Sequence, residues 1–320
     1  MADASPSGRV LLLSGGVGGA RMARGLARAL DDPARLAVAV NTADDFMHLG
    51  LAISPDLDTV LYTLAGVENA EQGWGRADET WSFLQAMEKL GGETWFRLGD
   101  KDLALHVFRT RALAEGRTLS AVMAEAARVF DVACEILPMT DDRVATVVET
   151  DAGTLTFQDY FVRRRCGPRV KGFRFIGADS ARPLPRLMEL LAEPDLRAVV
   201  IGPSNPFVSV APILAVPGVS QAIQTCAVPV VAVSPLVGGQ AVKGPAAKMI
   251  AEMGGEPSVR WIAERYAGLI DGLVVDEADR AAAEAIRGPR VRVAKTVMRD
   301  EADRATLAAD VLAFAEEIRS

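Results

Sequence analysis

Four aspartates lie close to one of the chain's only two histidines, directly after an apolar run, residues 36–40, that has the pattern of a buried strand. These residues are Asp44, Asp45, His48, Asp56 and Asp58. Hard divalent cations such as magnesium bind oxygen ligands of this kind, with water and phosphate completing the coordination. A solvated acidic loop followed by a helix that begins at Ser54 is the simpler alternative, because charged side chains are usually exposed. Two pairs of aspartates just beyond a strand favour the cation site.

A glycine-rich turn stands near the start of the chain, between a predicted strand, residues 10–13, and a predicted helix that runs to Leu30. Strand, glycine turn and helix together are typical of a unit that brings bare backbone and a helix N-terminus to a phosphate. Tight packing of the helix on the strand explains such a turn about as often. The residues predicted to bind substrate here are Gly15, Gly16, Val17, Gly18 and Gly19.

Two familiar nucleotide motifs are incomplete in this turn. Arg21 stands where the last glycine of a GxGxxG dinucleotide motif belongs, and the lysine and hydroxyl residue that end a P-loop are missing. Asn41 follows the second strand, where many NAD-binding proteins carry an acidic residue for the ribose. The sequence therefore disfavours an NAD-dependent dehydrogenase.

A second series of strands and helices begins near residue 196. Predicted strands at 198–202 and 228–233 each end in a loop rich in serine, glycine, asparagine and proline. In a parallel sheet these loops fall on the same carboxyl edge as the glycine turn and the aspartates. The loops add the substrate-binding candidates Ser204, Asn205, Ser234, Gly238, Lys243 and Gly244.

The middle of the chain changes from helical periodicity, as at 77–90, to short strand-like runs from residue 133 onward. We predict one α/β domain over residues 1–320, with the fold of a Rossmann-like three-layer αβα sandwich and a mostly parallel sheet. Its core spans about residues 8–65 and 195–320, and an α+β insertion spans about 66–194.

Composition limits the partners of the protein. Hydrophobic residues make up 50% and charged residues 24%, and the formal net charge of −7 gives no general attraction to nucleic acid or an anionic membrane. Cys134, Cys166 and Cys226 form no CxxC pair, which excludes a zinc site evident from sequence and favours a reducing compartment. The first ten residues lack a basic region before an apolar core. We expect a cytoplasmic protein that binds neither nucleic acid nor membrane.

Compared as a set, the loops resemble those of the 2-phospho-L-lactate transferase family of coenzyme F-420 biosynthesis. The matching segments run in order across nearly the whole chain: SGGVGGAR, NTADD, ISPDLDTVLYTLAG, RLGDKDLALH, LPMTDDRV, FQDYFVRR, IGPSNPFVSVAPILAVPG and VSPLVGGQAVKGPAAK. The segment GGVGGAR departs from the Gly-Thr-Gly-Thr-Pro-Lys of many relatives.

The resemblance implies a magnesium cofactor and a homodimer, together with the Rossmann-like fold. It also implies transfer of a phospholactyl-type group from a guanosine diphosphate adduct to the terminal ribityl hydroxyl of the deazaflavin Fo, with release of GMP. The group on the donor is phospholactyl, phosphoenolpyruvyl or phosphoglyceryl in different members.

This chemistry assigns roles to the candidate residues, because joining an alcohol to a diphosphate needs an aligned hydroxyl and neutralised phosphoryl oxygens. We assign magnesium to Asp45 and Asp58, with Asp56 as an alternative ligand. Asp58 is the first choice for contact with the attacking hydroxyl, since Fo binding in the family maps to this Asp of PDLDT. Asp45 and Asp58 are therefore the predicted catalytic residues.

The remaining candidates are predicted to bind the two substrates. Arg97, just before LGDKD, is predicted to orient Fo or the donor. Asn41 and His48 join the substrate-binding set. The glycine turn, with Ser204, Asn205, Ser234, Gly238, Lys243 and Gly244, is predicted to hold the guanosine diphosphate portion.

A non-catalytic nucleotide-sugar-binding regulator of the gluconeogenesis-factor type is the main alternative. Such proteins share the strand, the glycine turn and the acidic loop, but usually carry a run rich in glycine and serine after the aspartate pair. Phe46, Met47 and His48 stand in that place here, followed by SPDLDT, which favours the transferase.

Overall fold

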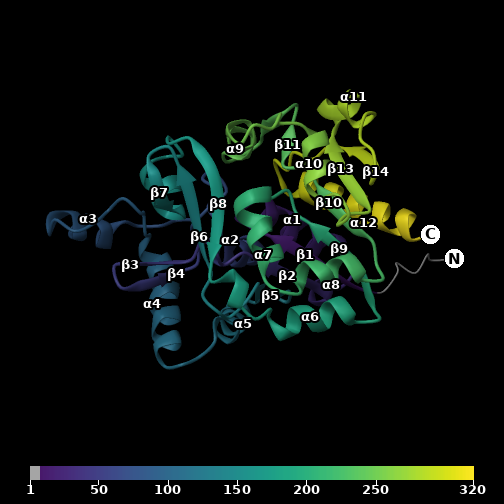
Figure 1. Cartoon of the computed structure of the whole chain (residues 1–320). Coiled ribbons are helices and arrows are strands. Elements are labelled where there is room, and N and C mark those ends of the chain that lie inside the picture. The colour runs from purple at the N-terminus through teal and green to yellow at the C-terminus, as the bar shows by residue number, and fades with distance from the viewer. Residues whose placement is uncertain (1–7) are drawn as a thin grey trace.

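A seven-stranded sheet forms the centre of the protein (Figure 1). The computed structural model describes residues 8–320, so residues 1–7, which make up most of the N-terminal segment considered above and the start of the predicted domain, lie outside the described residues. Neighbouring strands are parallel throughout, in the order β14-β13-β10-β9-β1-β2-β5. The strands are β1 (Arg9–Ser14), β2 (Leu36–Val40), β5 (Glu135–Pro138), β9 (Leu196–Ile201), β10 (Val230–Val233), β13 (Gly272–Asp276) and β14 (Arg290–Ala294).

The direction in which strands are added reverses at β1. From β1 the chain adds β2 and β5 on one side, and then returns to add β9, β10, β13 and β14 on the other. In open α/β sheets, ligands bind outside the carboxyl ends of the strands at such a reversal. The fold therefore places the favoured binding position between the ends of β1 and β9.

Helices cover both faces of this sheet. Successive residues of β1 enter two different hydrophobic cores, since Leu11 and Leu13 pack into one core and Val10 and Leu12 into the other. Side chains of α6, α7, α8, α9 and α10 complete the first core, and those of α1, α2, α5 and α12 complete the second. The predicted three-layer αβα sandwich with a parallel sheet is thus confirmed.

The helices have the following bounds: α1 (Gly16–Ala29), α2 (Pro55–Ala65), α3 (Ser82–Lys89), α4 (Asp100–Ala114), α5 (Leu119–Val129), α6 (Pro185–Ala192), α7 (Ala211–Ala215), α8 (Val219–Thr225), α9 (Ala246–Glu252), α10 (Val259–Arg265), α11 (Arg280–Ala283) and α12 (Glu301–Arg319). Among the described residues, no single helix is long and apolar enough to cross a membrane. The segments Pro206–Ala215 and Val219–Thr225 reach the length and apolar composition of a membrane span only when taken together, and a bend of 89° separates them.

Elements from the middle of the chain form a second, smaller layer beside the core. Strands β6 (Ala145–Thr150), β7 (Gly153–Thr156) and β8 (Val170–Ile176) make an antiparallel sheet in the order β7-β6-β8. Figure 1 shows this sheet together with α3, α4 and the hairpin of β3 (Phe46–His48) and β4 (Leu51–Ile53) on the side of the molecule away from the two termini. The last hairpin is β11 (Leu236–Val237) and β12 (Gln240–Ala241).

The structure differs from the predicted insertion, residues 66–194, in two elements. Strand β5 lies within that range but pairs with β2 at the edge of the central sheet, and α6 packs on the same core. The predicted helix at 77–90 is also shorter, because the Asp100 carboxylate accepts the backbone N–H groups of Ser82 and Phe83 and so fixes the start of α3. Apolar spacing marks each of these segments as a strand or helix but carries no information about its partner.

Helices α1 and α12 approach closely on one face of the sheet at Gly25. A Cβ atom at this position would lie 2.3 Å from the Arg304 backbone oxygen and 3.3 Å from Ala308 Cβ. Real Cβ atoms do not tolerate such a distance to a backbone oxygen, so a side chain here would push the two helices apart.

We expect Gly25→Ala to lower the free energy of unfolding by about 1–3 kcal/mol, despite the better helix propensity of alanine, because the contact is overpacked. Urea denaturation followed by circular dichroism measures this change. Arg28→Ala, on the exposed face of the same helix, is the matched control and should change stability by less than about 1 kcal/mol. An unchanged or more stable Gly25→Ala variant would contradict the close approach.

Candidate active site

The glycine turn between β1 and α1 packs directly against the loop that follows β9. Gly15 is the N-cap of α1, and its backbone N–H donates to Ser204 Oγ over 3.2 Å. A Cβ atom on Gly18 would lie 2.2 Å from Pro203 O, and one on Gly19 would lie 2.7 Å from Ser204 Oγ. The glycines therefore let two loops meet at the strand reversal, and Ser204 contacts the turn at the sheet edge where the sequence placed its loop.

Asp56 and Asn41 connect this turn to the acidic stretch. Asp56 Oδ1 accepts the Gly16 N–H over 2.8 Å, which places a carboxylate at the positive end of the α1 dipole. Asn41 Nδ2 lies 3.0 Å from both Asp56 Oδ2 and Asp44 Oδ2. The asparagine that stands where dinucleotide folds carry an acid is thus the donor that holds two carboxylates together.

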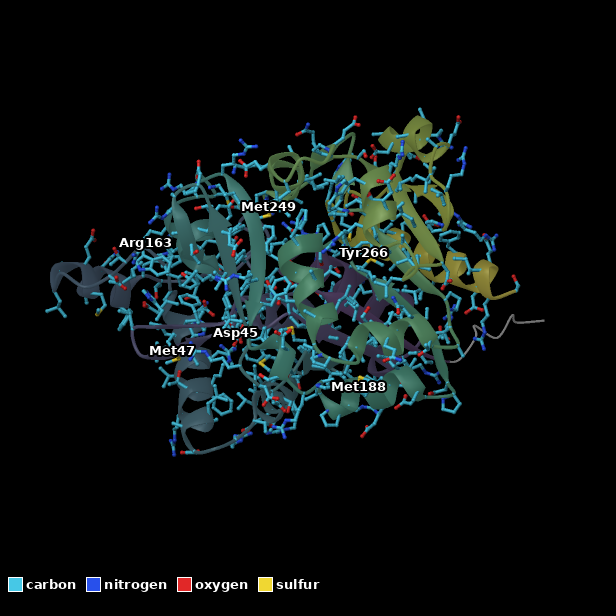
Figure 2. All side chains as sticks on the ribbon, viewed as in Figure 1. Asp45, Met47, Arg163, Met188, Met249 and Tyr266 are labelled. Carbon is cyan, nitrogen blue, oxygen red and sulfur yellow. The ribbon has the colours of Figure 1, made fainter. Side chains whose placement is uncertain are left out.

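The aspartates of the stretch are withdrawn from water. Asp44, Asp56 and Asp58 are at most 8% exposed, and Asp45 is half-buried with its Oδ1 atom inaccessible. Burial raises the pKa of each of these carboxyl groups, and for Asp44 the neighbouring Asp56 and Asp45 raise it further. Figure 2 shows Asp45 nearer the middle of the view than the exposed Met47 of the same stretch.

Two buried oxygens in this cluster, Asp44 Oδ1 and Asp45 Oδ1, have no hydrogen-bond partner among the described residues. The Thr146 side chain lies close to Asp44 and opposes the rise in its pKa. Asp45 Oδ2 accepts the Ser54 hydroxyl over 2.6 Å, which orients the carboxylate and leaves Oδ1 directed elsewhere. Concentrated buried negative charge with unused oxygen lone pairs matches the ligand preference of magnesium.

Asp58 has a different environment, which the sequence analysis missed. Arg109, a fully buried residue of α4, pairs with both of its oxygens: Nη2 with Oδ1, and Nη1 with Oδ2 at 3.1 Å. Burial raises the pKa of Asp58, and the charges of Arg109 and His106 oppose that rise. The available signal was the spacing of Asp102, His106 and Arg109, which places all three on one face of a helix.

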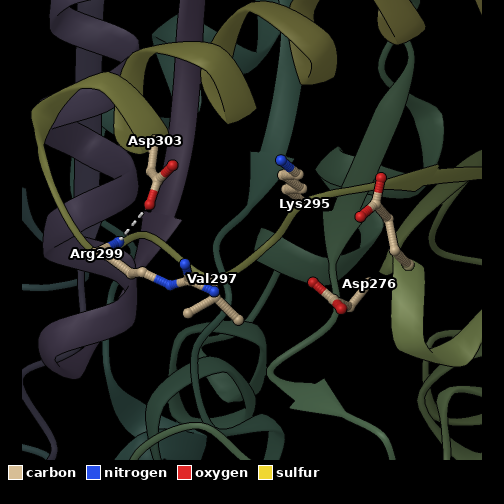
Figure 3. Close-up of a pocket in the computed structure, with 6 residues that line it drawn as sticks. Asp276, Lys295, Val297, Arg299 and Asp303 are labelled. Atoms are coloured by element: carbon tan, nitrogen blue, oxygen red, sulfur yellow. Dashed lines mark hydrogen bonds between the residues drawn. The ribbon is translucent and has the colours of Figure 1, made fainter.

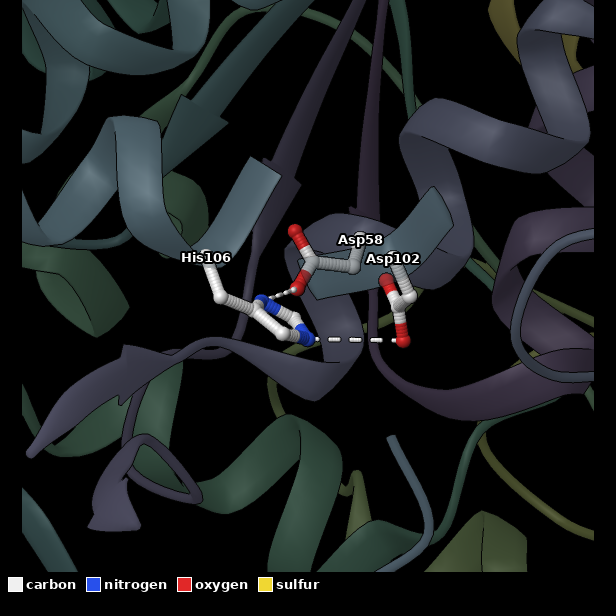
Figure 4. Close-up of side chains that lie close together, drawn as sticks. All are labelled: Asp58, Asp102 and His106. Atoms are coloured by element: carbon white, nitrogen blue, oxygen red, sulfur yellow. Dashed lines mark ion pairs between the residues drawn. The ribbon is translucent and has the colours of Figure 1, made fainter. Parts of the chain in front are cut away.

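Asp58, Asp102 and His106 also bring three possible metal-ligand atoms within 4.8 Å of one another (Figure 4). His106 Nε2 lies 3.3 Å from Asp102 Oδ2, and Nδ1 lies 3.6 Å from Asp58 Oδ2. The Tyr62 hydroxyl already donates to Asp102, and the Arg109 guanidinium already neutralises Asp58. Because the positively charged guanidinium would repel a cation here, we assign no metal to these three residues.

Two other predicted residues lie among aromatic side chains. Arg97 is exposed, and its guanidinium carbon lies 4.1 Å from the centre of the Trp81 ring. His48 is buried against Phe46, Trp95 and Phe96, and burial lowers the pKa of its imidazole. Neither is hydrogen-bonded to the four aspartates.

The loop after β12 reaches back to the glycine turn. A Cβ atom on Gly73 would lie 2.7 Å from Lys243 Nζ and 3.0 Å from Val17 Cγ1, so these three residues lie side by side. Burial and the nearby charge of Arg21 lower the pKa of Lys243. Two cationic side chains therefore stand close to the N-terminus of α1, and the neighbouring Gly244 adopts a positive φ of 76°.

The other residues predicted in these loops have local hydrogen bonds. Asn205 Oδ1 accepts the Phe207 N–H, Ser234 Oγ lies 3.1 Å from Leu236 O, and the Gly238 N–H donates to Asp279. These contacts shape the loops after β9 and β10 at the same edge of the sheet.

A separate hollow lies beyond the ends of β13 and β14 (Figure 3). Two of its carboxylates are hydrogen-bonded, since Asp276 accepts from Thr296 and Ala278, and Asp303 accepts the Arg299 N–H, and the third, Glu277, is exposed. The hollow therefore lacks the buried unused oxygens found in the aspartate cluster.

Comparison with known proteins identifies close relatives of this chain. Residues 10–315 match the family model described as 2-phospho-L-lactate transferase CofD. A protein named phosphoenolpyruvate transferase from Streptomyces griseus is 42% identical over 98% of this chain and 100% of its own length. A protein named 2-phospho-L-lactate transferase from Methanopyrus kandleri is 42% identical over 97% of this chain and 98% of its own.

A solved structure shares the fold at much lower sequence identity. It is a member of the UPF0052 family from Bacillus halodurans, with a TM-score of 0.61, 18% identity, and coverage of 96% of this chain and 99% of that one. At this identity the match supports the arrangement of layers and strands alone.

The raised pKa of Asp44 gives a test of the buried charge. In the folded protein this carboxyl holds its proton to higher pH than in the unfolded chain, so stability falls as pH rises above the unfolded value of about 3.9. In the absence of divalent cations, we expect Asp44→Asn to raise the free energy of unfolding at pH 7 by about 1–3 kcal/mol, and the gain to vanish near pH 4.

Urea denaturation at a series of pH values measures this difference. Asp142→Asn is the control of opposite sign, because Arg182 holds the pKa of that exposed carboxyl below its usual range. Its substitution should bring no gain at pH 7. An Asp44→Asn variant less stable than the wild type at pH 7 would show that the buried Asp44 charge does not destabilise the fold.

Proposed function

Because this chain belongs to the 2-phospho-L-lactate transferase CofD family, we propose that it transfers a phospholactyl-type group from a guanosine diphosphate adduct to the ribityl hydroxyl of the deazaflavin Fo and releases GMP. The observation that carries the proposal is the meeting of the glycine turn, Ser204 and the buried aspartates at the strand reversal. The Streptomyces griseus protein named for phosphoenolpyruvate and the Methanopyrus kandleri protein named for 2-phospho-L-lactate are each 42% identical to this chain, so phospholactyl, phosphoenolpyruvyl and phosphoglyceryl donors remain in the proposal.

In this proposal the diphosphate of the donor lies at the N-terminus of α1. The helix dipole and backbone N–H groups of the glycine turn attract the phosphates, and Lys243 adds a positive charge beside Val17. Asn205, Ser234, Gly238 and Gly244, on neighbouring loops of the same edge, are proposed to contact the guanosine. Local positive charge at the phosphates explains how a protein of net charge −7 holds an anionic donor.

Magnesium is proposed to bind the aspartate cluster, with Asp45 as the first ligand and Asp56 as the second. The unused buried oxygen of Asp45 supports this assignment, and the similar oxygen of Asp44 adds a further candidate. When bound there, the ion supplies positive charge against the phosphoryl oxygens. Asp58 is the least suited of the three predicted ligands, because the cationic Arg109 guanidinium pairs with both of its oxygens, whereas the partners of Asp56 are the uncharged N–H groups of Gly16 and Asn41.

Asp58 is instead proposed to receive the acceptor hydroxyl. As the ribityl oxygen bonds to the phosphorus that carries the three-carbon acid, the bond from that phosphorus to the GMP oxygen breaks, and the hydroxyl proton passes to the Asp58 carboxylate. Arg97 stays a proposed contact to Fo at the exposed rim, and His48 a proposed substrate contact. Homodimeric assembly, from the family resemblance, and a cytoplasmic location, from the sequence, are further proposals.

We expect Asp58→Asn to lower kcat for GMP release at least about 100-fold, because the hydroxyl loses its proton acceptor. The assay follows GMP from a synthetic guanosine diphosphate adduct with Fo and magnesium, on protein shown to be folded by circular dichroism. Glu115→Gln, an exposed change at the C-cap of α4, should leave kcat unchanged. Near-normal turnover by folded Asp58→Asn would remove this role, and binding of a UDP-sugar without GMP release by the wild type would favour the regulator.

Magnesium binding should be visible without turnover. We expect millimolar magnesium to raise the Tm of the wild type at pH 7.5, because the ion offsets buried negative charge, and an ion present at 100 times its Kd stabilises by about 2.7 kcal/mol. Asp45→Asn should lose most of this shift. Asp102→Asn is the matched control and should keep the Tm shift. A shift that is lost in Asp102→Asn and kept in Asp45→Asn would show that the ion binds at Asp102 and not at the aspartate cluster.

A further inference from the structure

A chain of buried polar contacts runs between α2 and α4 and ends at Asp58. The Tyr62 hydroxyl donates to Asp102 Oδ1 over 2.6 Å, and Asp102 Oδ2 lies 3.3 Å from His106 Nε2. His106 Nδ1 faces Asp58 Oδ2 at 3.6 Å, and Arg109 pairs with both Asp58 oxygens. Figure 4 shows the His106 ring between the two carboxylates.

The spacing of these residues along each helix brings them onto one seam. Asp58 and Tyr62 are one turn apart on α2, and Asp102, His106 and Arg109 recur at one-turn intervals on α4, so each set shares a helix face. Exposure is 0% for Arg109, 1% for His106 and Tyr62, 5% for Asp58 and 9% for Asp102. Solvent is therefore excluded along the whole chain of contacts.

Helix packing alone does not account for this arrangement. Removing a guanidinium and a carboxylate from water costs as much as their attraction returns, and apolar side chains of similar size pack two helices equally well. What apolar side chains cannot do is fix the direction in which a carboxylate points. The free-energy cost of burying the Arg109 and Asp58 charges is explained if the protein needs the Asp58 carboxylate in one orientation.

Given the transfer to a hydroxyl proposed above, we propose that Arg109 and His106 are positioning residues that hold the Asp58 carboxylate in the orientation that receives the acceptor hydroxyl. The planar guanidinium fork takes one oxygen with each nitrogen and so sets the plane of the carboxylate. The His106 ring packs beside Oδ2, with Nδ1 3.6 Å from this oxygen and 3.4 Å from Arg109 Nη1, and so limits rotation of the carboxylate. Each carboxylate oxygen accepts about two hydrogen bonds, so a lone pair remains for the hydroxyl.

Arg109 also ties Asp58 to the acidic stretch. Its Nη1 donates to Ala52 O over 3.2 Å, and Ala52 belongs to β4, the strand directly before Ser54. Ser54 in turn donates to Asp45. A single side chain of α4 therefore sets the position of the proposed hydroxyl acceptor relative to the proposed metal ligand. On the far side of the His106 ring, Asp102 Oδ2 lies 3.3 Å from Nε2, and the Tyr62 hydroxyl holds Asp102.

The test compares Arg109→Lys with Arg111→Lys in the GMP-release assay with Fo. Lysine keeps the charge at position 109 but loses the fork, and a misplacement of about 1 Å costs about 100-fold in rate. We expect kcat to fall about 10- to 100-fold, with KM for the guanosine diphosphate donor within about two-fold of wild type, because the proposed donor contacts lie at the glycine turn. Arg111, an exposed residue of the same helix whose side chain pairs with Glu115 at the helix C-cap, should show no change.

Two further comparisons separate positioning from general destabilisation. In an Asp58→Asn background, Arg109→Lys should add less than about two-fold to the loss, because the residue it orients is already disabled. His106→Asn keeps an amide near the Nδ1 position that faces Asp58, whereas His106→Gln keeps one near Nε2. We expect His106→Asn to retain at least about five times the kcat of His106→Gln, with both variants folded by circular dichroism.

Each outcome decides the proposal. A wild-type enzyme that turns over, with Arg109→Lys equally fast, overturns positioning and leaves the proposed function intact. Losses that multiply in the double variant, or His106→Gln at least as active as His106→Asn, also overturn positioning, and the histidine pair decides the question if Arg109→Lys does not fold. A wild type that releases no GMP with Fo overturns both the proposed function and this inference.

Discussion

The contact on which the site depends is the carboxylate of Asp56, which accepts the Gly16 N–H at the start of α1 and the amide of Asn41 at the end of β2. It joins the starts of two helices and the end of a strand at the reversal of the sheet. Because Asn41 also holds Asp44, the same contact gathers negative charge beneath the glycine turn. Buried charge of this kind needs nearby positive partners; the N-terminus of α1 supplies one, and the proposed magnesium ion would supply a second.

The second constraint is that a helix from the middle of the chain contributes a residue to the acidic site. Helix α4 lies outside the central sheet, yet its Arg109 pairs with Asp58 and contacts Ala52. Core and insertion therefore share one buried polar seam, and neither forms the complete site alone. A transferase needs such rigidity, since a hydroxyl and a phosphorus must be brought to reacting distance in one orientation.

The parts of the fold that could be predicted from the sequence are those that a local pattern of residues encodes. The continuous apolar runs of β1, β2, β9 and β10 identified strands with both faces covered, which is the signature of a parallel sheet between helices. The same pattern could not assign β5 to that sheet, because the pairing of β5 with β2 is a contact between residues about a hundred positions apart. The length of α3 was likewise set by Asp100, a cap remote in sequence.

By itself the sequence determined which residues share an edge. Residues that follow parallel strands must end on the same side of the sheet, so the glycine turn, the aspartates, Ser204 and Ser234 were placed by order alone. Only the tertiary structure decided what each group contacts there. Asn41 became the donor between two carboxylates and Arg109 the partner of Asp58 because hydrogen bonds and ion pairs depend on distances of a few ångströms between distant segments, which no local spacing encodes.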